Sequence, residues 1–253
     1  MSHDRLAEAD TALYFITDTA QCAAAGRSVA ETVAEAVAGG AGMVQIRDKD
    51  ITDDAMYDLT CDVLRAVDEV LGDAKITRPV PVFVNDRVAV VEQLNSEGHL
   101  VHLHVGQDDM PFAEVRQHIG QEALLGLSAT TPDQFAAARE AGTVDLLGVG
   151  LAFPTTTKKN ARDVLGPEKI RALAGEAGLP VFGIGGIDLA GAAKMHGTGV
   201  AGICVVSAIC TAADPRAAAA AIKTAFLTGQ TPDTEDRTET HDATGSHTAD
   251  GGR

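Results

Sequence analysis

The segment LYFITDTAQCAAAGRSVAETVAEAVAGGAGMVQIR, Leu13 to Arg47, predicts one complete strand–helix–strand unit. LYFIT and MVQIR, which begins at Met43, are short and rich in β-branched, aromatic and other apolar residues, as strands are. Between them, Ser28 and Glu31 have the spacing of a capping box, and two glycines end the helical pattern that follows. Two strands joined through a helix usually lie parallel in one sheet. The segment therefore predicts an α/β fold.

The same pattern recurs along the chain, and we predict eight strands in all. The six others begin at Pro81, His102, Leu124, Leu146, Pro180 and Gly202, and further helical patterns begin at Thr131, Gly166 and Asp214. Eight strand-then-helix units in 253 residues are typical of a (β/α)8 TIM barrel, with a doubly wound sheet as the alternative. We expect a single barrel domain over residues 13–229.

Both ends of the chain depart from this pattern. Residues 1–12 are predicted to be an N-terminal extension. From Thr231 the chain reads TPDTEDRTETHDATGSHTADGGR, in which no apolar residue is larger than Ala. Burial in such a segment cannot offset the entropy lost on ordering. We therefore expect residues 230–253 to be a disordered acidic tail.

Composition limits the partners. The chain has 20 Lys and Arg against 36 Asp and Glu, a net charge of -16, which argues against nucleic acid or an anionic membrane as partner. No apolar run approaches the roughly 20 residues of a membrane span, and the N-terminus is charged, so we expect a cytoplasmic protein. The acidity also suits a high-salt cytoplasm, where charges are screened. The four cysteines form no CxxC pair and are expected to be free, buried thiols.

Polar residues follow most of the predicted strands. In a TIM barrel the C-terminal ends of the strands carry the active site, so these residues are its candidates. They are Gln45, Arg47 and Lys49 after the second strand, Asn85, Asp86 and Arg87 after the third, Gln107, Asp108 and Asp109 after the fourth, Ser128 after the fifth, and Thr155, Thr156, Thr157, Lys158 and Lys159 after the sixth.

Carboxylates at the ends of two neighbouring strands predict a magnesium site. Asp86 and Asp109 are the expected ligands, because Mg²⁺ usually takes one or two carboxylates and leaves further positions to substrate phosphates. The alternative is a purely structural role, in which the helices that follow are capped by Asn85 with Asp86 and by Asp108 with Asp109.

Three cations are predicted to face the same space. Arg47, Lys49 and Lys158 on an otherwise acidic chain indicate a specific anion. Beside Mg²⁺ they suit a pyrophosphate group, whose charge must be neutralised before it departs.

A second anion site is predicted at the seventh and eighth strands, which end in GIGG from Gly183 and VVSAI from Val205. Loops in these positions form the phosphate site of many TIM barrels, where backbone N–H groups approach the anion. Thr155 and Thr157 would add hydroxyl donors. Two anion sites imply two phosphorylated ligands, which favours a transferase over an isomerase.

The motifs together resemble those of the thiamine phosphate synthase family, also called thiamine-phosphate pyrophosphorylase, from about Leu13 to Ile209. The residues that carry the resemblance are QIRDK from Gln45, ND at Asn85, HVGQDD from His104, GLS ending at Ser128, PTTTKK from Pro154, GIGGI from Gly183 and VVSAI from Val205. The segment LNSEGHLVHLHVG before the end of the fourth strand is longer than is usual in the family, which leaves that strand's start open.

The resemblance implies the condensation of 4-amino-2-methyl-5-hydroxymethylpyrimidine diphosphate with a thiazole ethyl phosphate, or its carboxylated form, to give thiamine phosphate and pyrophosphate, with carbon dioxide also released from the carboxylated form. It implies one Mg²⁺ per active site, held by Asp86 and Asp109, and catalytic roles for Arg47, Lys49 and Lys158. The implied contacts are Gln45, Arg47, Lys49, Asn85, Ser128 and Lys158 for the pyrimidine diphosphate, and Thr155, Thr156, Thr157, Gly186, Val206 and Ser207 for the thiazole phosphate.

Other functions on the same barrel remain open at the level of sequence. A thiazole tautomerase is expected to carry His where this chain has Thr130, and a regulator that only binds thiazole or thiamine phosphate could dispense with the metal ligands. His102 and His104 share a strand face, but we interpret them as ordinary strand residues and not as zinc ligands. The oligomeric state is also open, a homo-oligomer included.

Overall fold

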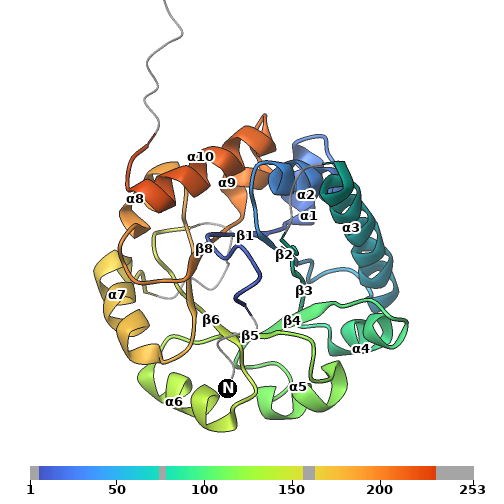
Figure 1. The fold of residues 1–253 in the computed structure, drawn as a ribbon, viewed down its shortest axis with the longest axis horizontal. Helices are drawn as coiled ribbons and strands as arrows, with labels where there is room; N and C mark the ends of the chain where they lie inside the picture. Colours follow the sequence, from blue (N-terminus) through green and yellow to red (C-terminus); the bar gives the residue numbers. More distant parts are fainter. Residues whose placement is uncertain (1–5, 74–77, 156–162, 232–253) are drawn as a thin grey trace, which may run out of the picture.

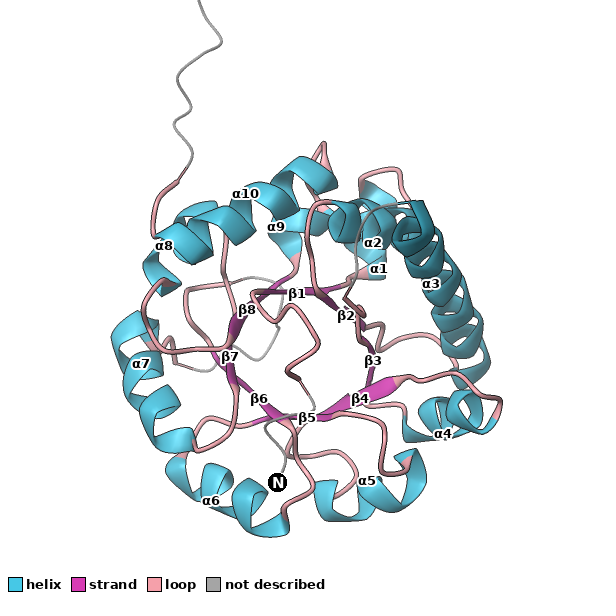
Figure 2. Cartoon of the chain, viewed as in Figure 1, coloured by secondary structure: helices cyan, strands magenta, loops and turns pink. Residues whose placement is uncertain are grey.

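The computed structural model describes residues 6–73, 78–155 and 163–231, and it confirms the predicted (β/α)8 barrel. Eight parallel strands close into a barrel in sequence order, because β1 pairs with both β2 and β8. Figure 2 shows the strands as an inner ring and the helices around it. The strands are β1 (Leu13–Ile16), β2 (Met43–Ile46), β3 (Val82–Asn85), β4 (His102–Val105), β5 (Leu125–Ser128), β6 (Leu146–Gly150), β7 (Val181–Ile184) and β8 (Gly202–Val205).

Helices begin at the four predicted start signals, Ser28, Thr131, Gly166 and Asp214, and the described residues form further helices besides these. They are α1 (Thr19–Ala24), α2 (Val29–Ala38), α3 (Asp53–Asp73), α4 (Val88–Ser96), α5 (Phe112–Ile119), α6 (Pro132–Ala141), α7 (Gly166–Ala177), α8 (Leu189–Met195), α9 (Ser207–Cys210) and α10 (Pro215–Thr228). The predicted capping box of Ser28 and Glu31 is present at α2, and Thr131 forms another with Gln134 at α6. Helix α9 is a short extra helix placed directly after β8.

The alternation of side chains along each strand produces two separate cores. Val44 and Ile46 of β2 face the helices and belong to the large aliphatic core, whereas Met43 packs inside the barrel with Tyr14 and Phe83. Of the nine aromatic residues, the inner core holds Tyr14, Phe83 and Phe182, and the rings of Tyr14 and Phe83 lie 5.3 Å apart between centroids. This filled interior leaves chemistry to the ends of the barrel.

The N-terminal mouth of the barrel is closed by the segment that precedes β1. Leu6 is buried and packs with the inner core, and in Figure 1 the dark blue segment before β1 crosses the middle of the ring. The hydroxyl of Thr11 donates to the carbonyl of Ala201 at 2.9 Å. Part of the predicted extension therefore belongs to the barrel; residues 1–5, like the predicted tail beyond residue 231, lie outside the described residues.

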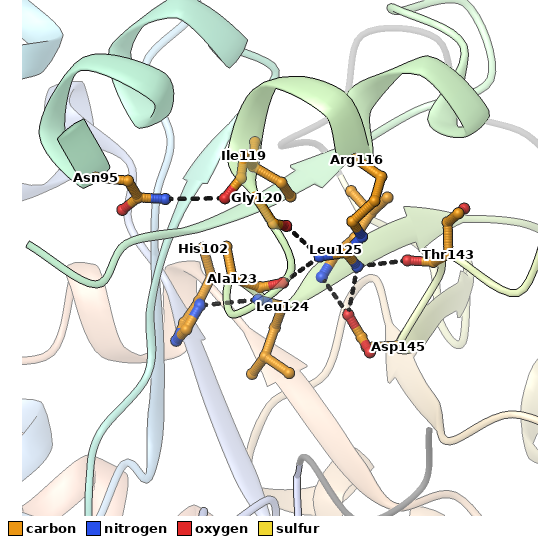
Figure 3. A network of polar contacts seen from close by, with 10 residues as sticks. All are labelled: Asn95, His102, Arg116, Ile119, Gly120, Ala123, Leu124, Leu125, Thr143 and Asp145. Atoms are coloured by element: carbon orange, nitrogen blue, oxygen red, sulfur yellow. Dashed lines mark hydrogen bonds and ion pairs between the residues drawn. The ribbon is translucent and has the colours of Figure 1, made fainter. Parts of the chain in front are cut away.

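A buried polar network fixes the start of β5 and β6 at the same end (Figure 3). The Arg116 guanidinium lies 2.9 Å from the Asp145 carboxylate, and it also donates to the carbonyls of Gly120, Ala123 and Thr143. The same carboxylate accepts the N–H of Leu125 at 2.7 Å. Each charge therefore has several partners, which a buried charge requires.

The cysteines are free thiols, as predicted: Cys22, Cys204 and Cys210 are buried, and Cys61 is half-buried. Within residues 6–73, 78–155 and 163–231, no helix is long and apolar enough to cross a membrane.

Candidate active site

The ends of β2, β3 and β4 bring a cation and two carboxylates together. The Lys49 ammonium lies 3.1 Å from Asp86 Oδ2, and the carboxyl groups of Asp86 and Asp109 are close enough to share a hydrogen bond. Beside this cluster is a cavity of about 320 Å³, lined by Asp48, Lys49, Asn85, Asp86 and Arg87. The rim predicted from the sequence thus forms one connected polar site at this side of the barrel.

Asp86 has an unusual backbone and an unfavourable electrostatic environment. Its φ of 63° is in the left-handed region, which non-glycine residues rarely adopt and which is often found at functional sites. Its N–H donates to the carbonyl of His104 at 2.9 Å, which fixes the turn against β4. Burial and the neighbouring Asp109 carboxyl raise the pKa of Asp86, although Lys49 opposes them. A cation bound there would relieve the repulsion between the two carboxylates.

The helix-capping interpretation of the two acidic pairs is wrong. Helix α4 has Arg87 at its N-cap position and α5 has Pro111, and neither cap has a side-chain hydrogen bond. Asp109 instead accepts the N–H of Gly106 at 2.7 Å within the loop after β4. The carboxylates are therefore oriented by loops and not by helix ends.

The two carboxylates fit Mg²⁺ better than a metal held by protein side chains alone. No group of three or more His, Cys, Asp or Glu side chains that could hold a metal occurs among the residues described. Asp86 and Asp109 supply two carboxylates with hard oxygen donors. Mg²⁺ commonly takes one or two carboxylates from a protein, while substrate phosphates and water complete its coordination shell.

Gln45 and Arg47 lie at different depths on the inner face of the barrel. Gln45 is 2% exposed, and its amide donates to the Tyr14 hydroxyl at 3.0 Å. Burial raises the pKa of Tyr14 well above its usual value, so this phenol stays neutral. Arg47 lies at the mouth, its N–H bonded to the Thr17 hydroxyl at 3.1 Å, and its guanidinium has no ion-pair partner among the described residues.

Sequence reasoning missed His104. Its Nε2 lies 3.1 Å from the Ser128 hydroxyl, so the side chain reaches the candidate site from β4. Gly126 leaves room for the ring, because a Cβ at that position would lie 2.3 Å from His104 Nδ1. His102 points to the same interior and accepts the Leu124 N–H at 3.0 Å. The signal was available in the spacing of the two histidines, combined with a glycine on the next strand.

The candidate site for the second phosphate lies at the same end of the barrel. Gly186 has a φ of 63°, and a Cβ there would lie 2.3 Å from the carbonyl oxygen of Pro154, so only glycine fits beside the β6 loop. Val206 is the N-cap residue of α9 and Ser207 its first residue. Thr155 is half-buried next to this loop. Thr156, Thr157 and Lys158 lie outside the described residues, so their placement stays a prediction.

Comparison with known proteins agrees with this geometry. A family model described as thiamine monophosphate synthase matches residues 13–209. The chain belongs to this family. Among its relatives, the thiamine-phosphate synthase of Psychrobacter sp. (strain PRwf-1) is 36% identical over 219 residues, covering 86% of this chain and 95% of the relative. That of Roseiflexus sp. (strain RS-1) is 40% identical over 210 residues, covering 83% of each.

Solved structures agree with the thiamine monophosphate synthase family. Thiamine phosphate pyrophosphorylase from Pyrococcus furiosus is 29% identical, with a TM-score of 0.71, and the alignment covers 87% of this chain and 97% of that one. Tryptophan synthase of Mycobacterium tuberculosis, at 18% identity and a TM-score of 0.57, shares the fold alone.

Proposed function

We propose that the protein is a thiamine-phosphate synthase. It joins 4-amino-2-methyl-5-hydroxymethylpyrimidine diphosphate to a thiazole ethyl phosphate, or its carboxylated form, and releases pyrophosphate, together with carbon dioxide when the thiazole is carboxylated. Besides family membership, one observation carries this proposal: Lys49, Asp86 and Asp109 converge beside a cavity of about 320 Å³. A cation adjoining two carboxylates suits a diphosphate with its metal ion better than a single phosphate.

The pyrimidine diphosphate would bind over β2, β3 and β5. Arg47, Lys49 and Lys158 would contact its phosphates, while Asn85 and Ser128 offer hydrogen bonds on either side of the metal site. Gln45 would meet the pyrimidine ring from below, because its buried amide is already oriented by Tyr14. An orienting partner of this kind reduces the entropy lost on binding.

Bond cleavage would depend on charge stabilisation and not on a protein nucleophile. The pyrimidine amino group pushes electron density toward the exocyclic methylene, so pyrophosphate can leave before the thiazole nitrogen attacks. Arg47, Lys49 and Lys158 would stabilise the departing charge, and the surrounding loops would keep water from the cation left behind. Asp86 and Asp109 would hold Mg²⁺, which supplies further neutralisation of the pyrophosphate when it is bound.

The thiazole phosphate would bind across the barrel mouth. The tight turn at Gly186 and the start of α9 at Val206 and Ser207 offer backbone N–H groups, with hydroxyls from Thr155, Thr156 and Thr157. A phosphate held there would present the thiazole nitrogen to the pyrimidine methylene. The proposal also places the protein in the cytoplasm, since four free thiols suit a reducing compartment.

The decisive experiment is incubation of the purified protein with both phosphorylated substrates and Mg²⁺, with chromatographic detection of thiamine phosphate. Lys158→Ala and Asp86→Ala are each expected to lower turnover at least about a hundredfold, the scale of a lost electrostatic contact in a transition state. Lys169→Ala on the exposed face of α7 is the control and should leave turnover unchanged.

Other results would favour the other functions. Binding of the thiazole phosphate without product would support a regulator, and isomerisation of the thiazole phosphate alone would support a tautomerase. Near-normal turnover of Lys158→Ala or Asp86→Ala would refute the role given to that residue.

A further inference from the structure

Arg87 connects the candidate metal site to the loop that carries Lys49. It directly follows Asp86, and its side chain turns back across the barrel rim to the segment between β2 and α3. One terminal nitrogen lies 3.0 Å from the Asp53 carboxylate at the start of α3. The other donates to the carbonyl of Ile51 at 2.8 Å and to that of Lys49 at 3.3 Å.

We propose that Arg87 is a positioning residue for Lys49: by binding the backbone of the β2–α3 loop, it holds the Lys49 ammonium over the diphosphate site. This inference rests on the proposed function, in which Lys49 stabilises the leaving pyrophosphate. Arg87 itself would not contact the reacting atoms, because both of its terminal nitrogens already have protein partners.

The loop needs such a constraint. Lys49 is 57% exposed and has a long side chain, so its ammonium samples many positions unless its backbone is fixed. At its start the loop is held by the bond from the Arg47 N–H to the Thr17 hydroxyl. Beyond Arg47 its other hydrogen bonds are short-range, such as that from the Asp50 N–H to the Asp48 carboxylate at 2.9 Å. These shape the loop locally, whereas Arg87 ties it to β3 and thus to the candidate metal ligand.

Arginine suits this role better than lysine. Its planar guanidinium offers several donors in a fixed arrangement, so one side chain can bind Asp53 and two backbone carbonyls at once. A lysine at the same place would keep the charge but not the geometry. Arg87 would therefore connect the end of β3 to the loop after β2. Because it follows Asp86 directly and binds the Lys49 and Ile51 carbonyls, it would keep Asp86 and Lys49 at their separation of 3.1 Å.

The test is a double-mutant cycle of Arg87→Ala and Lys49→Ala. Arg87→Ala alone is expected to lower kcat/KM for the pyrimidine diphosphate about ten- to a hundredfold, as a misplaced group does, with the KM for the thiazole phosphate nearly unchanged. In the Lys49→Ala background, adding Arg87→Ala should change kcat/KM less than about twofold, because the residue acted upon is gone. Fully additive losses would overturn the inference and indicate direct contact with substrate.

Two further variants distinguish a positioning role of Arg87 from an effect of its charge alone and from the general effect of losing an exposed ion pair. Arg87→Lys should recover little of the lost activity; full recovery would show that charge alone matters and would overturn the inference. Arg65→Ala is the matched control, because Arg65 forms an ion pair with Asp62 on the exposed face of α3, also at 3.0 Å. It should leave all kinetic constants unchanged.

A binding measurement distinguishes this inference from the proposed function. Calorimetric titration with inorganic pyrophosphate and Mg²⁺ should show weaker binding to Arg87→Ala than to the wild-type protein, and the same weakening in Lys49→Ala, whatever the protein synthesises. If Lys49→Ala loses activity and pyrophosphate affinity but Arg87→Ala loses neither, the inference fails and the proposed function stands. If Lys49→Ala behaves as wild type in both assays, the inference fails together with the role given to Lys49, whereas the proposed function fails only if the wild-type protein forms no thiamine phosphate.

Discussion

Charged groups differ in burial and in bonding partners between the two ends of the barrel. At the N-terminal end, Arg116 and Asp145 are 8% and 2% exposed and are bound by each other and by backbone groups. At the C-terminal end, Lys49 is 57% exposed, and the half-buried Asp86 faces another carboxyl; partial burial and this neighbour raise the pKa of Asp86. Removing one partner from a satisfied buried pair is destabilising because it leaves an uncompensated charge, whereas charged groups left in unfavourable surroundings are suited to a charged ligand.

The largest effect is expected at the N-terminal end. Arg116→Ala would leave the Asp145 carboxylate buried without its cation, so the free energy of unfolding should fall by about 3–5 kcal/mol. The kinetic constants of the protein that remains folded should not change, because the network lies at the far end of the strands. Urea unfolding and steady-state kinetics check both parts.

Arg171→Ala, at an exposed position of α7, is the control for this variant and should unfold at the wild-type urea concentration. If Arg116→Ala kept wild-type stability, the view of this end as a stabilising network would be wrong.

Asp86→Asn should lower turnover without lowering stability, the reverse of Arg116→Ala. Turnover should fall about a hundredfold, equivalent to about 2.7 kcal/mol in the barrier, because a metal ligand and its charge are lost. Stability should not fall at neutral pH. The folded protein raises the pKa of Asp86, so its ionised form disfavours folding above that pKa; asparagine removes this cost, and the difference disappears as the pH falls below the unfolded pKa.

Thermal unfolding at several pH values, together with turnover at saturating substrate, measures both parts of this signature. Asp58→Asn, at an exposed position of α3, is the control, with neither effect expected. A clear loss of stability in Asp86→Asn at neutral pH would mean that the residue is structural.

The sequence was sufficient to predict the barrel and the meeting of Lys49, Asp86 and Asp109 at one end of it, because both depend on local pattern. Alternating strand and helix signals specify a parallel barrel, and the residues after each strand must then meet at one end. No local sequence pattern predicts contacts between segments that lie far apart in the chain. The burial of Leu6 in the barrel mouth and the reach of Arg87 to Ile51 depend on loop paths, and the acidic pairs resembled helix caps because their spacing fits both roles.

Gly126→Ala is expected to act on both the interior and the site. An added methyl group would overlap His104 Nδ1, so the ring must move, at a cost of about 1–3 kcal/mol in unfolding free energy. The contact between His104 and Ser128 should also be lost, which would raise the KM for the pyrimidine diphosphate. Gly175→Ala in α7, where nothing lies within 4 Å, is the matched control and should be neutral or slightly stabilising.

The smallest effect is expected for the ion pair that fastens the N-terminal segment. Lys223 lies 2.6 Å from Asp10 and donates to the Gly40 carbonyl at 2.9 Å, but its side chain is 21% exposed. Partly exposed pairs contribute little, so Lys223→Ala should lower the unfolding free energy by about 1 kcal/mol, and added salt should narrow the difference. Both KM values should stay unchanged. A raised KM would mean that the closed end of the barrel affects the open one, and the division of roles between the two ends would then be false.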